Sequence, residues 1–208
     1  LQIDVSGDIP VQDNRPTSQT QPRQPEQKEV FGMNEHESKI RDEFFKQWYT
    51  NIRQLQYILA TAQLETDNFH TMREYSRWQW KKYGETYYWR GYAQLTWKDS
   101  YQKYQSVLSA RWYLKEGESI VTDPDIVTRP DIAAFIIVHG MMTGHFTGRK
   151  LTEFINGSKT DFIWARQTVN GTDKAWRIAG IARDHYGPIL NDSLQVGKEF
   201  YVVQDGDT

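Results

Sequence analysis

Apolar side chains recur at helical spacing along several stretches of the chain. Residues 34–49 place four large apolar side chains on one helix face, with Asn34 or Glu35 as the expected start. Residues 51–64 carry a second apolar face and contain no Gly or Pro. The polar run that begins at Glu65 continues a helix poorly, so the second helix should end there with its apolar face deep in the core.

The stretch 131–142 is almost wholly apolar, which predicts a central buried helix, and Gly140 within it indicates close helix packing. Weaker patterns predict further helices at 96–107, 150–155, 160–169 and 173–186. We expect loop over 66–90, with short strands around 72–76 and 87–93. The whole pattern predicts a mainly α domain of about seven helices with a small irregular or β segment.

The two ends of the chain are polar. Residues 1–30 are rich in Gln, Pro, Asp, Ser and Thr, and such a segment cannot offset its ordering entropy by burial. We therefore divide the chain into an extended arm or linker (1–30), one compact domain (31–190) and a tail (191–208). We expect the arm to bind a partner protein or to lead to a preceding domain. The start at Leu1 fits a processed product or a piece of a longer polypeptide.

Composition excludes several classes of function. The 208 residues carry a formal net charge of -2, which gives no argument for nucleic-acid binding. The chain has no cysteine, which excludes disulfides and thiolate metal ligands. No apolar run is long enough for a transmembrane helix, so we expect no membrane partner. The aromatic residues, 14% of the chain, either fill the core or form ring platforms along a sugar-binding cleft.

Two carboxylates and a polar, aromatic strip follow one another in the middle of the chain. Glu65 ends the second predicted helix, and Glu74 comes after a short polar segment. The strip RGYAQLTW follows at residues 90–97. Cleavage of a sugar–sugar bond needs two acids beside a groove of this kind, one to protonate the leaving group and one to activate water.

Six segments resemble motifs of the family 19 glycoside hydrolases: ILATAQLET, MREY, RGYAQLTW, PDIAAFIIVHGM, FTGRKL and VNGTDKAWRIAGIA. They lie in the family's order over roughly residues 40–187, and they resemble the phage-type lysozymes and endolysins of that superfamily most closely. The resemblance implies a lysozyme-like helical fold. It also implies hydrolysis of β-1,4 bonds in N-acetylhexosamine polymers, which are peptidoglycan for phage members and chitin for others.

The resemblance assigns catalytic roles to three residues. Glu65 matches the general acid, although Leu64 stands where relatives carry His; this departure would make the surroundings of Glu65 more apolar and favour its protonated form. Glu74 matches the general base of phage members, with Glu85 as the alternative because plant members place the second acid on a longer loop. Thr96 matches the residue that helps to hold the attacking water.

The resemblance also implies a set of substrate-binding residues, which we take to be Gln94, Tyr92, Trp97, Ser100 and Asn170. Ser100 stands where relatives usually carry Asn, which is a further departure from the family pattern. Trp89 replaces the first Gly of a common Gly-Arg-Gly motif, where it would either narrow the cleft or offer a stacking face.

Such a hydrolase needs no cofactor and no metal, and we expect His70, His139 and His145 to be packing or surface residues. The expected partner is the peptidoglycan glycan strand, with other phage virion or tail proteins bound through residues 1–30 and 191–208. The resemblance places the protein in a phage virion or in the host cytoplasm, acting on the host cell wall. Two other functions stay open at this point: a chitinase, and a virion component that mainly docks or binds sugar.

Overall fold

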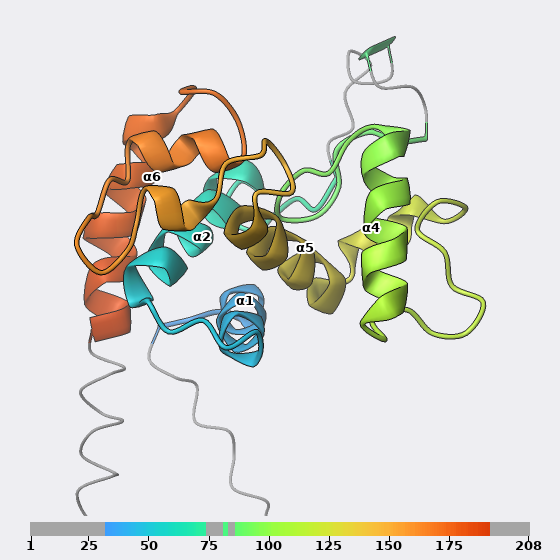
Figure 1. The fold of residues 1–208 in the computed structure, drawn as a ribbon, viewed down its shortest axis with the longest axis horizontal. Coiled ribbons are helices and arrows are strands. Elements are labelled where there is room, and N and C mark those ends of the chain that lie inside the picture. The colour runs from blue at the N-terminus through green and yellow to red at the C-terminus, as the bar shows by residue number, and fades with distance from the viewer. Residues whose placement is uncertain (1–31, 74–80, 83–85, 192–208) are drawn as a thin grey trace, which may run out of the picture.

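The computed structural model describes residues 32–73, 81–82 and 86–191 (Figure 1). These residues form a mainly helical domain with five α-helices and no strand in the described part, which confirms the predicted helical class. The predicted arm and nearly all of the predicted tail lie outside the described residues. Their docking role therefore stays a prediction.

Two capped helices begin the domain. α1 spans Glu35–Lys46 and starts at Asn34, whose Oδ1 accepts from the Glu37 amide at 3.0 Å, while Glu37 Oε2 accepts from the Asn34 amide at 2.7 Å. α2 spans Ile52–Glu65 and ends at Glu65 as predicted. Its middle, 54–62, is buried on every side, so the prediction of one apolar face was too narrow.

α5, Pro130–Thr143, is the central element (Figure 1). All residues of 132–142 are buried, which confirms the predicted central helix. Gly140 allows a close contact, because a Cβ there would lie 2.1 Å from Cζ of Phe146. The predicted close approach is therefore confirmed, but it involves a ring in the following turn rather than another helix.

α4, Lys98–Ala110, reaches α5 through Tyr104, whose hydroxyl donates to the Ile136 carbonyl at 3.1 Å, and the C-terminal helical elements pack on α2 (Figure 1). The shorter elements are the 3-10 turns Pro124–Thr128, Leu151–Glu153 and Trp164–Thr168, the helix α6 at Ala175–Gly180, and a π-helix at Ile181–Tyr186 that continues as helix over 187–191.

Two of the predicted helices are only short turns. The predictions at 150–155 and 160–169 reduce to the 3-10 turns 151–153 and 164–168. Polar side chains there bind nearby backbone amides instead: Asn156 Oδ1 accepts from the Ser158 and Lys159 amides, both at 3.0 Å. Such local bonds offer the backbone an alternative to the helical ladder.

The strand prediction at 87–93 is wrong, because the structure has only isolated bridges there. Arg90 pairs with Leu95 on one side and with Arg73 on the other. Among the described helices, none has the length and apolar character needed to cross a bilayer.

Candidate active site

Glu65 is placed by an abrupt end to α2. Thr66 caps the helix by donating its hydroxyl to the Ala62 carbonyl at 2.6 Å and accepting from the Phe69 amide at 3.0 Å. Residues 67–69 then all take left-handed backbone angles, with φ of 49°, 58° and 65°. Each left-handed non-glycine residue is sterically disfavoured, and such geometry is concentrated at functional sites. The chain therefore turns sharply away and leaves Glu65 at the edge of a cavity.

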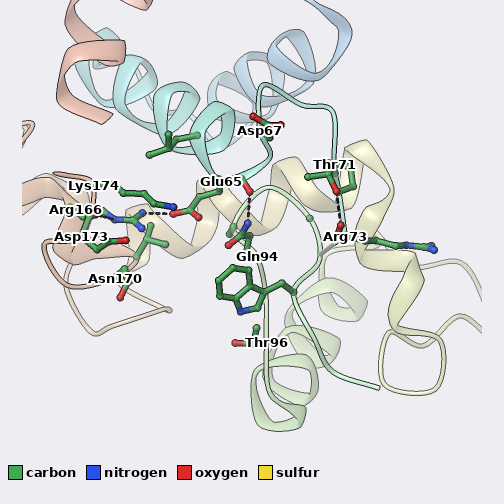
Figure 2. Close-up of a pocket in the computed structure, with 16 residues that line it drawn as sticks. Glu65, Asp67, Thr71, Arg73, Gln94, Thr96, Arg166, Asn170, Asp173 and Lys174 are labelled. Atoms are coloured by element: carbon green, nitrogen blue, oxygen red, sulfur yellow. Dashed lines mark hydrogen bonds and ion pairs between the residues drawn. The ribbon is translucent and has the colours of Figure 1, made fainter. Parts of the chain in front are cut away.

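Arg166 holds the Glu65 carboxylate from the C-terminal half of the chain. Its Nη1 lies 2.6 Å from Glu65 Oε1, and the two side chains are only 2% and 10% exposed (Figure 2). The contact is an ion pair without the alignment of a hydrogen bond, so Nη1 has no aligned acceptor in the described part of the chain. Arg166 Nε donates to the Asp173 carbonyl at 3.0 Å, which fixes the plane of the guanidinium.

A tight turn brings the opposite wall of the cavity toward Glu65. The Leu95 amide donates to the Arg90 carbonyl at 2.9 Å, and Gly91 turns the chain with a φ of 73°. Gln94 lies in this turn and donates its side-chain amide to the backbone carbonyl of Glu65 (Figure 2). The end of α2 is thereby tied to the turn that carries Gln94 and Thr96.

The cavity between these parts has a volume of about 560 Å³. Its walls come from residues within 64–73, 89–96 and 166–174. Apolar side chains such as Leu64 and Val169 share the lining with carboxylates and with the cation Lys174. A concave site with an apolar wall and a few convergent polar groups is the usual form of a ligand-binding site.

The buried phenol of Tyr57 is close enough to the Arg166–Glu65 ion pair to feel both charges. Burial raises the pKa of Tyr57 well above its usual range, with a smaller opposing effect from Arg166 and a smaller raising effect from Glu65. Its hydroxyl is buried and has no hydrogen-bond partner within the described residues. Tyr57 therefore stays neutral and adds no charge to the site.

The structure brings four of the predicted residues to one cavity, namely Glu65, Gln94, Thr96 and Asn170. Leu64 and Trp89, two of the three departures from the family pattern, line it as well.

Three other predicted substrate contacts lie elsewhere. Trp97 and Ser100 line a neighbouring hollow of about 210 Å³, which shares the walls Gln94 and Thr96 with the main cavity. The prediction that Tyr92 binds the substrate is wrong, because Tyr92 is fully buried in the core and lines neither cavity. Its hydroxyl lies 2.6 Å from Nδ1 of His36. Tyr92 supports the turn from behind.

The two candidates for the general base, Glu74 and Glu85, lie outside the described residues. Arg73, the described residue before Glu74, lines the cavity and pairs with Asp125 at 2.9 Å. Asp125 also holds Arg90 Nε at 2.8 Å, so one carboxylate ties the 73 and 90 segments together.

Sequence reasoning did not identify Arg166, Lys174 or Asp67 as cavity residues. Arg166 sits in the segment FIWARQTV, where nothing in the local pattern separates a buried cation from an exposed one. The charge of Glu65 was the available signal, since a carboxylate at the mouth of a core requires a cation or donors close by.

The histidines show no metal-binding arrangement, and the described residues contain no group of three or more His, Cys, Asp or Glu that could hold a metal ion. No protein-family model matches the sequence, and the search of curated proteins gives no match.

Proposed function

We propose that the protein is a glycoside hydrolase of the phage lysozyme type, which cleaves the β-1,4 bond between MurNAc and GlcNAc in peptidoglycan. One observation carries the proposal. The nearly buried Glu65 side chain lines a cavity of about 560 Å³, where a buried guanidinium pairs with its carboxylate and a glutamine side chain binds its backbone carbonyl. Carboxylates fixed in this way beside a cleft are typical of acid–base catalysis.

Glu65 would act as the general acid and give its proton to the glycosidic oxygen. Arg166, whose Nη1 lies 2.6 Å from Glu65 Oε1, would stabilise the carboxylate that remains once the proton has left. The Gln94 contact to the Glu65 backbone would keep the carboxyl in position through the reaction.

Glu74 would act as the base and deprotonate a water held with the help of Thr96. An inverting glycosidase keeps its two carboxyl groups about 6.5–9.5 Å apart, which leaves room for that water on the far face of the sugar. The sugar would pass through an oxocarbenium-like state, and the anomeric configuration would invert. Glu85 is the alternative base.

The setting that we propose is a phage particle or an infected host, with the host cell wall as the substrate. The polar arm and the tail would then attach the domain to other virion or tail proteins. Chitin is the other N-acetylhexosamine polymer that the same chemistry would cleave, and the test below separates the two substrates.

Replacing Glu65 by Gln tests the acid. The amide cannot give up a proton as an acid does, but it keeps an oxygen toward Arg166, so we expect the domain to stay folded and lysis of purified cell walls to fall at least about 100-fold. Thermal unfolding of the variant checks the fold. Glu118→Gln is the matched control. Glu118 pairs with Arg129 at 2.8 Å and does not line the cavity, so this variant should keep full activity.

Mass spectrometry of the digestion products identifies the bond. We expect fragments with reducing-end MurNAc from cell walls and slow or no release from chitin oligomers. Reducing-end GlcNAc would identify a glucosaminidase instead, and freed peptides would refute a glycosidase. Full lysis by the folded Glu65→Gln variant would remove Glu65 from the mechanism.

A further inference from the structure

Two Trp-Tyr pairs form the same structure at two separate places. Trp48-Tyr49 follows α1, and Trp112-Tyr113 follows α4. In each case the Trp amide bonds back to the residue three before it, Phe45 or Ser109, and the Tyr amide to the residue five before it. This is the Schellman ending of a helix, in which the first residue after the cap takes a left-handed conformation.

Both Trp residues occupy the position where a helix ending prefers glycine. Trp48 has a φ of 64° and Trp112 a φ of 62°, values that a bulky side chain adopts rarely. Burial of the side chains does not offset the cost of this backbone conformation, because the two Trp side chains are 91% and 92% exposed. Fold stability alone would favour Gly or Asn at both sites, so the aromatic rings call for a role outside the fold.

The two corners meet around Lys46 and Tyr113. Lys46 Nζ donates to the Tyr113 hydroxyl at 2.7 Å, and that hydroxyl donates to Glu43 at 2.6 Å. Lys46 and Tyr113 line two hollows at once: one of about 350 Å³ whose walls include Trp48, and one of about 520 Å³ whose walls include Trp112. Neither hollow shares a lining residue with the cavity of Glu65.

The lining favours an uncharged, polyhydroxylated ligand. Aromatic faces attract the partly positive C–H groups of a sugar ring, and the side chains between them offer both donors and acceptors to hydroxyl groups. In the larger hollow the cations Lys39, Lys46, Lys115 and Arg129 are interspersed with the carboxylates Asp42, Glu43 and Asp131. A surface for anionic lipid would need an excess of positive charge, and a flat bilayer would not need two hollows.

We propose that these two Trp-Tyr corners form a second glycan-binding site, which holds a strand of β-linked N-acetylhexosamines while the cavity of Glu65 acts on it. This inference rests on the proposed function for the identity of the glycan. The site would raise the time that the enzyme spends on an insoluble cell wall, because two linked contacts bind more tightly than one.

The test replaces both Trp residues by Gly in the Glu65→Gln background, in which the wall is not consumed. Binding is measured by co-sedimentation with purified cell-wall sacculi and by titration with an N-acetylglucosamine hexamer. We expect the affinity for sacculi to fall at least tenfold. Because glycine relieves the left-handed backbone, we expect the melting temperature to stay the same or rise, so misfolding cannot explain the loss.

Trp176→Ala in the same background is the matched control. Trp176 lies on α6 and is 79% exposed, but it lines neither hollow, so binding should not change. Unchanged binding by the double Gly variant would overturn the proposal. So would a loss confined to flotation with phosphatidylglycerol vesicles, which would assign the rings to a membrane surface.

The outcomes separate this proposal from the active-site assignment. Lysis by the Glu65→Gln variant would refute the role of Glu65 and would by itself say nothing about the two Trp rings. Binding that survives the loss of both Trp rings would refute the second site and leave the acid in place.

Discussion

Arg166 joins two functions in one side chain. It holds the Glu65 carboxylate through Nη1 and the Asp173 carbonyl through Nε, and it is almost completely buried. A guanidinium can make both contacts because its donors lie in a rigid plane, whereas the ammonium of lysine is a single point on a flexible stem. The position of Glu65 therefore depends on the shape of Arg166 as well as on its charge.

We predict that Arg166→Lys keeps the fold but lowers kcat for cell-wall hydrolysis by about 10–100-fold, because a displacement of about 1 Å at a reacting group has an effect of this size. Steady-state kinetics on a soluble glycan measure the change. Arg149→Lys, at the exposed pair with Glu153, serves as the control and should leave kcat unaltered. A wild-type kcat for Arg166→Lys would show that charge alone suffices at this position.

At the scale of elements, α5 carries a histidine into the core. Burial, with smaller contributions from His145 and Arg111, lowers the pKa of His139 to about 4. The ring stacks on Phe135 at 5.2 Å, and its Nδ1 is buried without a hydrogen-bond partner among the described residues. The helix therefore holds His139 in the neutral form.

We predict that the free energy of unfolding falls by on the order of 2 kcal/mol as the pH drops from about 6.5 to about 4. The unfolded chain binds a proton at His139 below its ordinary pKa of 6.5, whereas the folded chain binds it only near 4. The stabilisation is thus complete above pH 6.5 and is lost on acidification. Burial also lowers the pKa of His145, which adds to the same trend.

Urea denaturation at several pH values in this window measures the effect. His139→Gln should be less stable at neutral pH, because it buries an amide, but its stability should depend less on pH. An equal pH dependence in the two proteins would show that His139 has the same pKa in the folded and the unfolded chain.

The long helices were predictable because burial follows a period that the sequence displays. α1, α2, α4 and α5 all appear close to their expected places, and the capping role of Asn34 follows from its residue type. The short elements were not predictable, since a few residues of apolar pattern do not separate a 3-10 turn from an α-helix. The left-handed run at 67–69 involves Asp, Asn and Phe, and Phe gives no signal for it.

Only those residues of the candidate site that lie within sequence motifs could be predicted. Glu65, Gln94 and Thr96 come from segments with motif-like sequences, and the structure does bring them to one cavity. Arg166 reaches Glu65 from a hundred residues away, as a consequence of tertiary packing that local periodicity does not encode. The prediction of a substrate contact for Tyr92 was wrong for a related reason. The motif identifies the turn, but it does not indicate which side of the turn faces the core.

At the scale of the whole molecule, three distant segments must stay in register for the cavity to exist. Asp125, in the 3-10 turn 124–128, connects two of them by pairing with Arg73 and Arg90. A backbone hydrogen bond also joins these two segments, from the Gly91 amide to the Met72 carbonyl at 2.9 Å. Arg90 is almost fully buried, so the loss of Asp125 would remove the carboxylate partner of a charge that has little access to water.

We predict that Asp125→Ala lowers the stability by about 1–2 kcal/mol, less than for a fully buried pair, because Asp125 itself is partly exposed. The loss should be local, so hydrogen exchange should speed up at the Gly91 and Leu95 amides and stay slow in α5. Catalysis should weaken mainly through a higher KM, because this clamp (Asp125 with Arg73 and Arg90) holds a wall of the cavity and not Glu65 itself. Glu118→Ala removes an ion pair elsewhere and should leave these amides protected. If exchange instead rises evenly through the domain in Asp125→Ala, the clamp supports the fold as a whole, and the wall of the cavity has no independent freedom to open.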